Sequence, residues 1–272
     1  MSRNKELRKA LRVEPGERFD LSKRDPADFH GWEKDEGEEE TKDLLRRLDD
    51  LHDRFWAEGK RALLLVFQGM DASGKDGAIR NVMSALNPQG CFVASFKVPT
   101  PEEAAHDFLW RVHKKVPGKG EVGVFNRSHY EEVLIVRVNE LVPRDVWQGR
   151  YEHINEFEEL LAETGTVIVK FMLHISPEQQ RLRLQERFDN PKKRWKFSMG
   201  DLEVRTRWDD YMEAYNDALG KTSKDHAPWY VIPAERNWFR DLAVATIVAE
   251  TLEDLKPDYP QPEDLPETLT VT

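Results

Sequence analysis

A glycine-rich turn at residues 69–77, GMDASGKDG, carries residue types that bind phosphate. It follows the pattern G-x-x-x-x-G-K-[ST], in which backbone N–H groups and a lysine, here Lys75, surround phosphate oxygens. The last position of the pattern holds Asp76 instead of a metal-binding Ser or Thr, and a second carboxylate, Asp71, lies inside the turn. A glycine-rich turn without a ligand is the alternative interpretation. The predicted phosphate-binding residues of this turn are Gly69, Ala72, Ser73, Gly74, Lys75, Asp76 and Gly77.

The two carboxylates of this turn need a physical role, because a bare carboxylate repels phosphate. A divalent cation between carboxylate and phosphate turns this repulsion into attraction, since Mg²⁺ (or Mn²⁺) prefers oxygen ligands and links the two groups. We therefore predict that Asp71 replaces the missing hydroxyl as the metal ligand. For Asp76 two roles stay open: support of that metal, or a favourable interaction with the N-terminus of the helix that follows.

The segment FNRSHYEE at residues 125–132 ends a predicted buried strand and contains a second candidate site. Arg127 follows the strand directly, and a guanidinium there is suited to bidentate contact with phosphate oxygens. Nucleotide kinases commonly have an acid followed by an arginine at this position, and here Asn126 replaces the acid. A surface ion pair is the alternative for Arg127, and a solvated helix face is the alternative for Glu131.

The segment RLRLQERFDNPKKRWKFS at residues 181–198 concentrates positive charge in a chain whose formal net charge is -10. Long basic side chains above a phosphate loop would form a lid that supplies charge to the transition state and excludes water. A solvated helix face is the alternative, but Arg183 and Arg187 repel one another at i,i+4 spacing, which favours an anionic partner. Trp195 and Phe197 anchor this lid, stack on a base or belong to the core. The basic residues are Arg181, Arg183, Arg187, Lys192, Lys193, Arg194 and Lys196.

Between the phosphate loop and the lid, residues 95–115 contain candidate contacts for an acceptor nucleotide. Lys97 and Arg111 are the main cations of this segment, whereas His106 and His113 are weaker candidates, because a lone histidine is more often structural. The predicted nucleotide-binding residues are Asn87, Lys97, Arg111, Asn126, Arg127 and Glu131. The predicted catalytic residues are Asp71, Lys75, Arg127 and Arg187, and the predicted phosphate-binding lid residues are Lys192, Arg194 and Lys196.

These residues lie on a regular alternation of strands and helices. Short apolar segments such as ALLLVFQ are typical of strands buried on both faces of a parallel sheet. We therefore predict an α/β fold, a parallel five-stranded sheet flanked by helices, with ligands at the carboxyl ends of its strands. The predicted strands are 62–68, 91–97, 121–126, 166–175 and 229–233. The predicted helices are 38–58, 75–86, 101–116, 129–138, 144–163, 176–188, 200–220 and 237–256.

The composition suggests a globular enzyme-sized chain with a polar surface. With 272 residues and 39% hydrophobic residues it can form one large domain or two small ones. The net charge of -10 argues against a nucleic-acid partner. A single cysteine, Cys91, favours a reducing compartment. Because no segment approaches the about 20 apolar residues of a membrane span, we predict a cytoplasmic protein without a membrane partner.

Three regions are expected along the chain. Residues 1–37 show no sustained period and are predicted to form an extension that lies on the surface or reaches a neighbouring subunit. Residues 38–256 form the predicted kinase domain, with its lid around 181–220. The acidic, proline-rich tail 257–272 is expected to have little structure of its own.

Five motifs together resemble the family-2 polyphosphate kinases: G-x-D-A-x-G-K-D, ALNPQG, SFKVPTPEEAAHDFLWR, FNRSHYEEVLIVRV and NPKKRWKFSMGDL. They occur in the family's order over roughly residues 30–255, and the combination is far more specific than the loop alone. The resemblance implies a P-loop kinase core of the thymidylate-kinase type with a helical lid. It places the essential loop residues on Asp71 and Lys75, and the arginine after the third strand on Arg127. The lid cations that it implies include Arg187, Lys192 and Lys196.

The resemblance also implies a reaction and its partners. Such enzymes transfer phosphoryl groups, with Mg²⁺, between inorganic polyphosphate and nucleotides, and they form homo-oligomers such as dimers or tetramers. The version NRSHYE is similar to the subgroup that accepts AMP as well as ADP, so AMP, ADP and ATP are the expected nucleotides and guanine nucleotides are further candidates. Asn126 stands where an aspartate is common, which assigns more of the metal binding to Asp71, and Glu131 stands where others carry asparagine.

Two other functions remain as alternatives. An ATP-dependent nucleotide kinase would share every local feature except the loop aspartate and the excess of lid charge. A non-catalytic polyanion sensor on a kinase fold would bind polyphosphate without turnover. The choice of phosphoryl donor separates all three.

Overall fold

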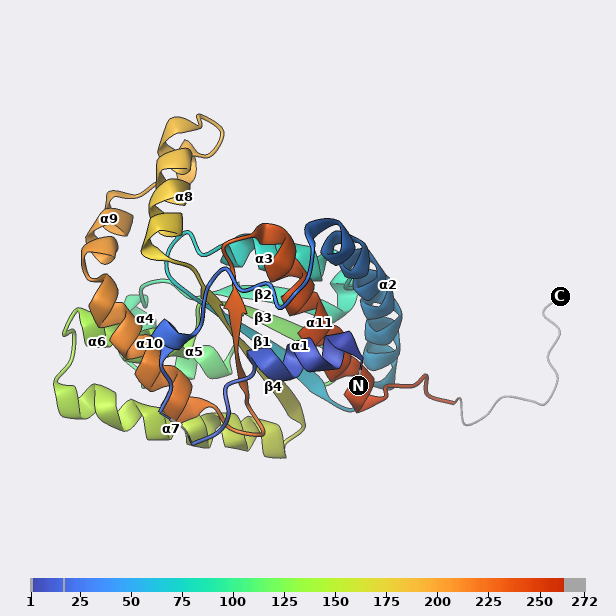
Figure 1. The fold of residues 1–272 in the computed structure, drawn as a ribbon. Coiled ribbons are helices and arrows are strands. Elements are labelled where there is room, and N and C mark those ends of the chain that lie inside the picture. The colour runs from blue at the N-terminus through green and yellow to red at the C-terminus, as the bar shows by residue number, and fades with distance from the viewer. Residues whose placement is uncertain (1, 17, 262–272) are drawn as a thin grey trace, which may run out of the picture.

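The computed structural model describes residues 2–16 and 18–261. At its centre lies a parallel sheet in the order β2-β3-β1-β4-β5, with helices on both faces (Figure 1). The predicted α/β fold with a parallel five-stranded sheet is confirmed. The strands are β1 (Ala62–Gln68), β2 (Cys91–Ser95), β3 (Val122–Asn126), β4 (Thr166–His174) and β5 (Trp229–Pro233).

The register of the sheet brings three functional segments to one edge. Asn126, the last residue of β3, is aligned with Phe67 of β1 on one side and with Ser95 of β2 on the other. Because the strands are parallel, the chain leaves all three of them in the same direction. The glycine-rich turn, the turn containing Arg127 and the segment containing Lys97 therefore begin side by side.

Two groups of helices cover the two faces of the sheet, each with its own apolar cluster (Figure 1). One face carries α1 (Arg3–Leu11), α2 (Lys34–Glu58), α3 (Lys75–Met83) and α11 (Asn237–Leu255). The other carries α6 (Ile135–Val138), α7 (Arg144–Glu163) and α10 (Trp208–Thr222). The remaining helices are α4 (Pro101–Ala104), α5 (Trp110–His113), α8 (Pro177–Asp189) and α9 (Met199–Thr206), with short 3-10 turns η1 (Leu21–Lys23), η2 (Pro88–Gly90), η3 (His129–Val133) and η4 (Arg194–Lys196).

The predicted continuous helix 101–116 is wrong, because the chain forms the separate helices α4 and α5 there. The carboxylate of Asp107 accepts hydrogen bonds from the backbone N–H groups of Leu109 and Trp110, both at 3.0 Å. This side-chain turn starts a new helix in the middle of a segment whose apolar spacing looks continuous.

Two other predicted helices are also interrupted. Residues 129–138 form η3 and α6, separated at Leu134, whose φ of -108° and ψ of -92° are not helical. Residues 200–220 form α9 and α10, separated at Arg207 with ψ of 28°.

Residues 1–37, expected to lie on the surface or to reach a neighbouring subunit, pack partly into the core of their own chain. Leu7 and Leu11 of α1 are 3% and 2% exposed and belong to the same apolar cluster as α2 and α11. The backbone N–H of Val13 donates to the carbonyl of Trp229 at 2.9 Å, which covers the outer edge of β5. A domain boundary at residue 37 would fall inside α2, which begins at Lys34.

The lid segment rises above the carboxyl edge of the sheet, where α8 projects from the body of the molecule (Figure 1). Ser176 caps this helix by accepting a hydrogen bond from the backbone N–H of Gln179 at 3.1 Å, and Pro177 occupies its first turn, as predicted. Residues 257–261 form no helix or strand, and the rest of the predicted tail, 262–272, lies outside the described residues.

Across 2–16 and 18–261, every helix is too short or too polar to cross a lipid bilayer.

Candidate active site

The turn after β1 has a backbone that only glycine adopts without strain at two positions. Gly69 has φ of 147° and Gly74 has φ of 103°. A Cβ atom at Gly69 would lie 2.7 Å from the carbonyl oxygen of Leu173, and one at Gly74 would lie 2.5 Å from Nη1 of Arg240. Packing against backbone thus requires a glycine at Gly69, whereas at Gly74 the left-handed φ is the main constraint, because the end of the Arg240 side chain can shift.

Lys75 is the first residue of α3, and its side chain folds back over the turn. Its Nζ donates to the carbonyl of Gly69 at 2.5 Å and to that of Met70 at 3.2 Å. Burial lowers the pKa of Lys75, although the negative charge of Asp71 partly opposes that effect. The ammonium is thus held near the N-terminus of α3, where backbone N–H groups and the helix dipole also attract anions.

Asp71 and Arg127 form an ion pair between the turn after β1 and the turn after β3. Oδ1 of Asp71 accepts from Nη2 of Arg127 at 2.8 Å. Arg127 has φ of 61°, which is uncommon for a residue other than glycine, and its backbone N–H donates to the carbonyl of Phe67 at 3.0 Å. The structure brings together the two residues to which the sequence assigned metal and phosphate, and these two roles stay predictions.

Asp76, whose role the sequence left open, joins three elements. Its Oδ1 accepts from Nδ2 of Asn126 at 3.1 Å, and its Oδ2 accepts from Nζ of Lys196 at 2.9 Å. The hydrogen bond from Lys196 is the main reason why the pKa of Asp76 lies below its ordinary value. Asp76 therefore links α3 to the end of β3 and to the lid segment.

A cleft of about 980 Å³ lies between the glycine-rich turn and the lid segment. Twelve of the predicted site residues line it, together with Arg80, Arg183, Lys193, Trp195 and Asp201. Trp195 is 78% exposed at the rim, which agrees with a surface role rather than with the core. The predicted residues that line the cleft are Asp71, Ala72, Ser73, Gly74, Lys75, Asp76, Lys97, Asn126, Arg127, Arg187, Lys192 and Lys196.

Four predicted residues do not line this cleft but lie close to it. Gly69 and Gly77 shape the turn from behind. The side chain of Arg111 is buried and donates from Nη1 to the carbonyl of Lys97 at 2.8 Å. Glu131 accepts from Nε2 of Gln68 at 3.1 Å, directly before the turn. Arg111 and Glu131 are thus placed to support the cleft from its sides.

Two other predicted residues have different partners. Oδ1 of Asn87 accepts from the backbone N–H of Gln89 at 3.0 Å and caps η2, away from the cleft lining. Nε of Arg194 donates to the carbonyl of Phe188 at 2.8 Å and closes the loop after α8. Their predicted roles in nucleotide and phosphate binding have no support from their positions.

The cations of the lid segment do not all point toward the cleft. Arg181 is exposed and forms an ion pair at 2.7 Å with Glu178, a neighbour on the same helix. Arg187 lies at the cleft, with Nη1 3.5 Å from Oδ2 of Asp201. Burial and the nearby charge of Asp71 raise the pKa of Asp201, a carboxylate that the sequence interpretation missed.

Sequence reasoning named Arg183 as a lid cation but missed its contact with the glycine-rich turn, and it missed Gln180 and Arg240 altogether. Gln180 and Arg183 of α8 donate hydrogen bonds to its carbonyl groups, and Arg240 of α11 packs against Gly74 and Gly77. Arg240 could have been noticed, since it is the one basic residue of α11. Gln180 carries no comparable signal, because polar residues are frequent along the whole of α8.

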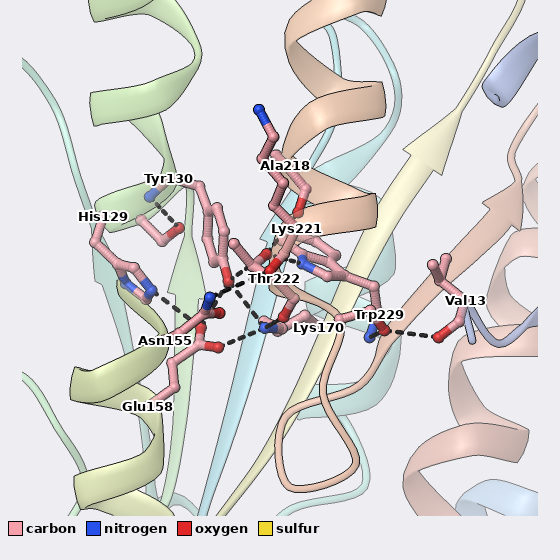
Figure 2. A network of polar contacts seen from close by, with 12 residues as sticks. Val13, His129, Tyr130, Asn155, Glu158, Lys170, Ala218, Lys221, Thr222 and Trp229 are labelled. Atoms are coloured by element: carbon pink, nitrogen blue, oxygen red, sulfur yellow. Dashed lines mark hydrogen bonds and ion pairs between the residues drawn. The ribbon is translucent and has the colours of Figure 1, made fainter. Parts of the chain in front are cut away.

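A buried polar network supports the segment after Arg127 (Figure 2). Nζ of Lys170, in the middle of β4, donates to Oε2 of Glu158 at 2.5 Å, to the hydroxyl of Tyr130 at 2.8 Å and to the carbonyl of Thr222 at 2.8 Å. The Lys170 and Glu158 side chains are 0% exposed. Burial lowers the pKa of Lys170 to about 8. The network joins β4 to α7, to η3 and to the last turn of α10.

The same network fixes two consecutive residues of η3. Oε1 of Glu158 accepts from the hydroxyl of Tyr130 at 2.9 Å and lies 3.1 Å from Nε2 of His129. Burial alone would raise the pKa of Glu158, but the charge of Lys170 and the hydrogen bond with His129 outweigh it and lower the pKa. The turn that presents Arg127 is thereby anchored to the core immediately after that residue.

The donor set of the cleft fits a divalent cation that prefers oxygen. Mg²⁺ is commonly bound by one or two carboxylates together with substrate phosphates and water. The carboxylates of Asp71 and Asp201 both line the cleft, and Asp71 uses one oxygen for Arg127. Within the described residues, no group of three or more His, Cys, Asp or Glu side chains forms a closed metal site. A metal held jointly by protein and phosphate therefore fits better than a metal held by protein alone.

Comparisons with known proteins identify the family. The family model described as Polyphosphate kinase 2 (PPK2) matches residues 14–260. The chain is 56% identical over 265 residues to the AMP/ADP-polyphosphate phosphotransferase of Meiothermus ruber, covering 97% of this chain and 99% of that protein. It is 47% identical to the ADP-polyphosphate phosphotransferase of Rhodopseudomonas palustris, covering 93% of this chain and 92% of that protein.

A solved structure agrees with these relatives. The crystal structure of polyphosphate kinase 2 from Arthrobacter aurescens matches the fold with a TM-score of 0.91 and 44% identity, covering 95% of this chain and 93% of that chain. The match to a P-loop kinase fold, which the glycine-rich turn suggested, thus extends over nearly the whole chain. The chain belongs to the polyphosphate kinase 2 family.

Proposed function

We propose that this protein transfers phosphoryl groups between inorganic polyphosphate and the nucleotides AMP and ADP, forming ADP and ATP reversibly. Its membership of the polyphosphate kinase 2 family and the names of its relatives support this function. The observation that carries it is the 2.8 Å contact between Asp71 and Arg127 at a cleft that Lys75 and the lid cations also line. Such a cleft suits two phosphate-bearing substrates that must be brought end to end.

Charge neutralisation is the main task of the protein in this reaction. Two polyanionic substrates repel one another, so the site must hold them in line while it compensates their charge. Lys75 and Arg127 are placed to stabilise the phosphoryl group in transfer, and Arg187 adds charge from the lid side. Lys192 and Lys196 extend the positive lining toward the rim of the cleft, where a longer polyphosphate chain would lie.

The metal role falls on Asp71. When bound, Mg²⁺ (or Mn²⁺) would join phosphate oxygens and reduce their charge. Asp71 would hold the cation through its carboxylate, and Arg127 keeps that carboxylate oriented toward the cleft. Asp201 is the second carboxylate within the same lining.

No protein nucleophile or general base is needed. A terminal phosphate oxygen of the nucleotide attacks the end phosphorus of polyphosphate, and the shortened polyphosphate leaves with the bonding electron pair. Because the second pKa of a phosphate monoester is about 6, the attacking oxygen is already largely ionised at neutral pH. The chain therefore contributes orientation and charge rather than proton transfer.

The acceptor nucleotide is assigned to the β2 side of the cleft. Lys97 and Asn126 line it there, and Arg111 holds the carbonyl of Lys97 from below. Glu131 accepts a hydrogen bond from Gln68, the residue directly before the glycine-rich turn, and so lies close to that turn. These positions support Lys97, Asn126, Arg127 and, less directly, Arg111 and Glu131 as nucleotide contacts.

The choice of donor tests the function. Purified protein is incubated with Mg²⁺ and long-chain polyphosphate, without ATP, and with AMP, ADP, GMP or GDP in parallel; nucleotides are separated by anion-exchange chromatography. We expect ADP from AMP and ATP from ADP. Turnover with ATP alone as donor would favour a nucleotide kinase, and polyphosphate binding without turnover would favour a polyanion sensor.

We also propose a cytoplasmic location and a homo-oligomeric state. The location is supported by the single cysteine and by the nucleotide substrates proposed above. The oligomer follows from the family resemblance, and light scattering coupled to gel filtration measures it directly. A monomer at micromolar concentration would contradict the proposed assembly.

A further inference from the structure

Three consecutive carbonyl groups of the glycine-rich turn are bound by two side chains of α8. Nε2 of Gln180 donates to the carbonyl of Asp71 at 3.1 Å. Nη1 of Arg183 donates to the carbonyls of Ala72 and Ser73, both at 3.0 Å. Gln180 and Arg183 are three residues apart and therefore lie on the same face of α8.

The guanidinium of Arg183 also binds a second loop. Its Nη2 donates to the carbonyls of Ala234 and Glu235, at 2.7 Å and 3.1 Å. These residues follow β5, so one side chain joins the turn after β1 to the turn after β5. Burial and the nearby charge of Arg240 lower the pKa of Arg183 to about 10. All four contacts go to protein carbonyls.

Gln180 is tied in turn to the next lid helix. It is 0% exposed, and its Oε1 accepts from Nη1 of Arg205 in α9 at 3.2 Å. Arg205 also donates to the carbonyl of Pro177 at 2.5 Å, at the start of α8. Gln180 thus connects the carbonyl of Asp71 to α8, on which it lies, and through Arg205 to α9.

The contacts from Gln180 and Arg183 go to carbonyl groups of the turn and not to its N–H groups, although Arg183 also lines the cleft. A phosphate loop works because successive backbone N–H groups point at one anion, which forces the neighbouring carbonyls to point away from it. Buried carbonyls need donors, and a loop whose carbonyls lose their partners can relax to another conformation. Ala72 has φ of 64°, a strained value for a residue with a Cβ, so the turn depends on such outside support.

We propose that Gln180 and Arg183 are positioning residues that hold the glycine-rich turn in its phosphate-binding conformation through the carbonyls of Asp71, Ala72 and Ser73. This inference rests on the proposed function, since it assigns the turn a phosphate ligand. It differs from the lid interpretation of the sequence, in which Arg183 supplies charge to an anionic substrate. Although Arg183 lines the cleft, its role in this proposal is to hold the carbonyls of Ala72 and Ser73, and so the turn's backbone, rather than to contact phosphate.

Four variants separate the two roles of Arg183. Arg183→Lys keeps the charge but loses the planar fork that reaches four carbonyls, and Arg183→Met removes both. Gln180→Met removes the donor to Asp71 without touching any charge. Arg181→Lys is the matched control, because Arg181 lies on the exposed side of the same helix and pairs with Glu178.

We expect kcat to fall about 10- to 100-fold in Arg183→Lys, in Arg183→Met and in Gln180→Met, because small displacements of a site have effects of this size. The KM for AMP should stay within about twofold of wild type, and Arg181→Lys should match wild type throughout. Wild-type kcat in Arg183→Lys would overturn the proposal. If the Arg183 variants do not fold, as judged by Tm, the kcat of Gln180→Met decides alone, and an unchanged value overturns it.

Binding of tripolyphosphate provides a measurement that does not need turnover. Calorimetric affinity is measured over a series of salt concentrations. A side chain that contacts phosphate contributes about one unit to the slope of log K against log salt, so Arg183→Met should keep the wild-type slope while the affinity falls. A reduced slope would mean direct phosphate contact and would overturn the proposal. Failure of wild type to bind tripolyphosphate or to turn over polyphosphate would instead contradict the proposed function.

Discussion

Asp76 and Lys196 form an ion pair of 2.9 Å between the first turn of α3 and the lid segment after α8. The pair connects the glycine-rich turn to a lid residue 120 positions later in the chain. Both side chains are partly exposed, so the pair contributes little to holding the lid against the turn. The carboxylate that departs from the phosphate-loop pattern is therefore a contact between loop and lid.

Replacing this carboxylate should have a small effect. In Asp76→Asn the ion pair is lost, and partly exposed pairs contribute up to about 1 kcal/mol, or about fivefold. We expect kcat/KM for polyphosphate to change by no more than that factor. Steady-state kinetics at low and high salt measure it, and the difference should shrink with salt. A loss above about 100-fold would assign Asp76 to the metal.

Asp71→Asn should have a much larger effect than Asp76→Asn. The amide keeps the hydrogen-bonding shape but loses the charge that holds a cation, so turnover should be abolished at every Mg²⁺ concentration. Without Mg²⁺, tripolyphosphate should bind more tightly, since a repulsive charge has been removed. Kinetics over a Mg²⁺ series and calorimetry measure both, and Asp76→Asn is the matched control. Turnover that survives at ordinary Mg²⁺ would contradict the metal role of Asp71.

Phosphate binding should weaken at alkaline pH through Lys75. Burial lowers the pKa of Lys75, so its ammonium loses the proton at a lower pH than the ordinary value of about 10.4. The charged form binds phosphate, and affinity for tripolyphosphate should therefore fall as the pH rises through the lowered pKa. Calorimetry between neutral and alkaline pH tests this. Lys75→Arg should bind without that alkaline decrease, and a decrease that persists in Lys75→Arg would exclude Lys75 as its cause.

The buried pair of Lys170 and Glu158 should dominate local stability. Lys170→Met leaves a buried carboxylate without its partner, and breaking such a pair costs about 3–5 kcal/mol. Urea unfolding should show this loss in the free energy of unfolding. The double variant Lys170→Met with Glu158→Gln removes the orphaned charge and should recover a large part of it. Equal stabilities of the single and double variants would contradict this explanation.

The N-terminal helix should behave as part of the core. Leu11 is 2% exposed, and Leu11→Ala should lower the free energy of unfolding by about 2–5 kcal/mol. Leu141, which is 64% exposed, is the control, and its replacement by alanine should stay within about 0.5 kcal/mol. Equal effects at the two positions would contradict a role of the N-terminal helix in the core.

The sheet and its ligand-binding edge could be predicted because their signals are local. Continuous apolar runs mark buried strands, and the glycine pattern marks the turn after β1. Asp71, Lys75 and Arg127 could therefore be placed at one edge of the sheet from the sequence alone. The interruption of the helix predicted over 101–116 could not be predicted. There the side chain of Asp107 forms a turn that breaks an apolar spacing which looks continuous in the sequence.

The two arginines Arg181 and Arg183 show the limit of such reasoning. They are of one type and two residues apart, yet one pairs with Glu178 at the surface and the other binds four buried carbonyls. Which side of α8 faces the turn depends on long-range packing that no local pattern specifies. The capping of η2 by Asn87 could not be predicted for a related reason, because the motif that contains this residue carries no sign of the cap.

The carbonyl contacts of Lys75 have an entropic consequence. A free lysine side chain loses up to about 2 kcal/mol of rotamer entropy when it is immobilised. Because Gly69 and Met70 already hold the ammonium, this loss occurs during folding and not during phosphate binding. Wild-type protein should therefore bind short phosphate chains with less unfavourable entropy than a variant whose lysine is mobile.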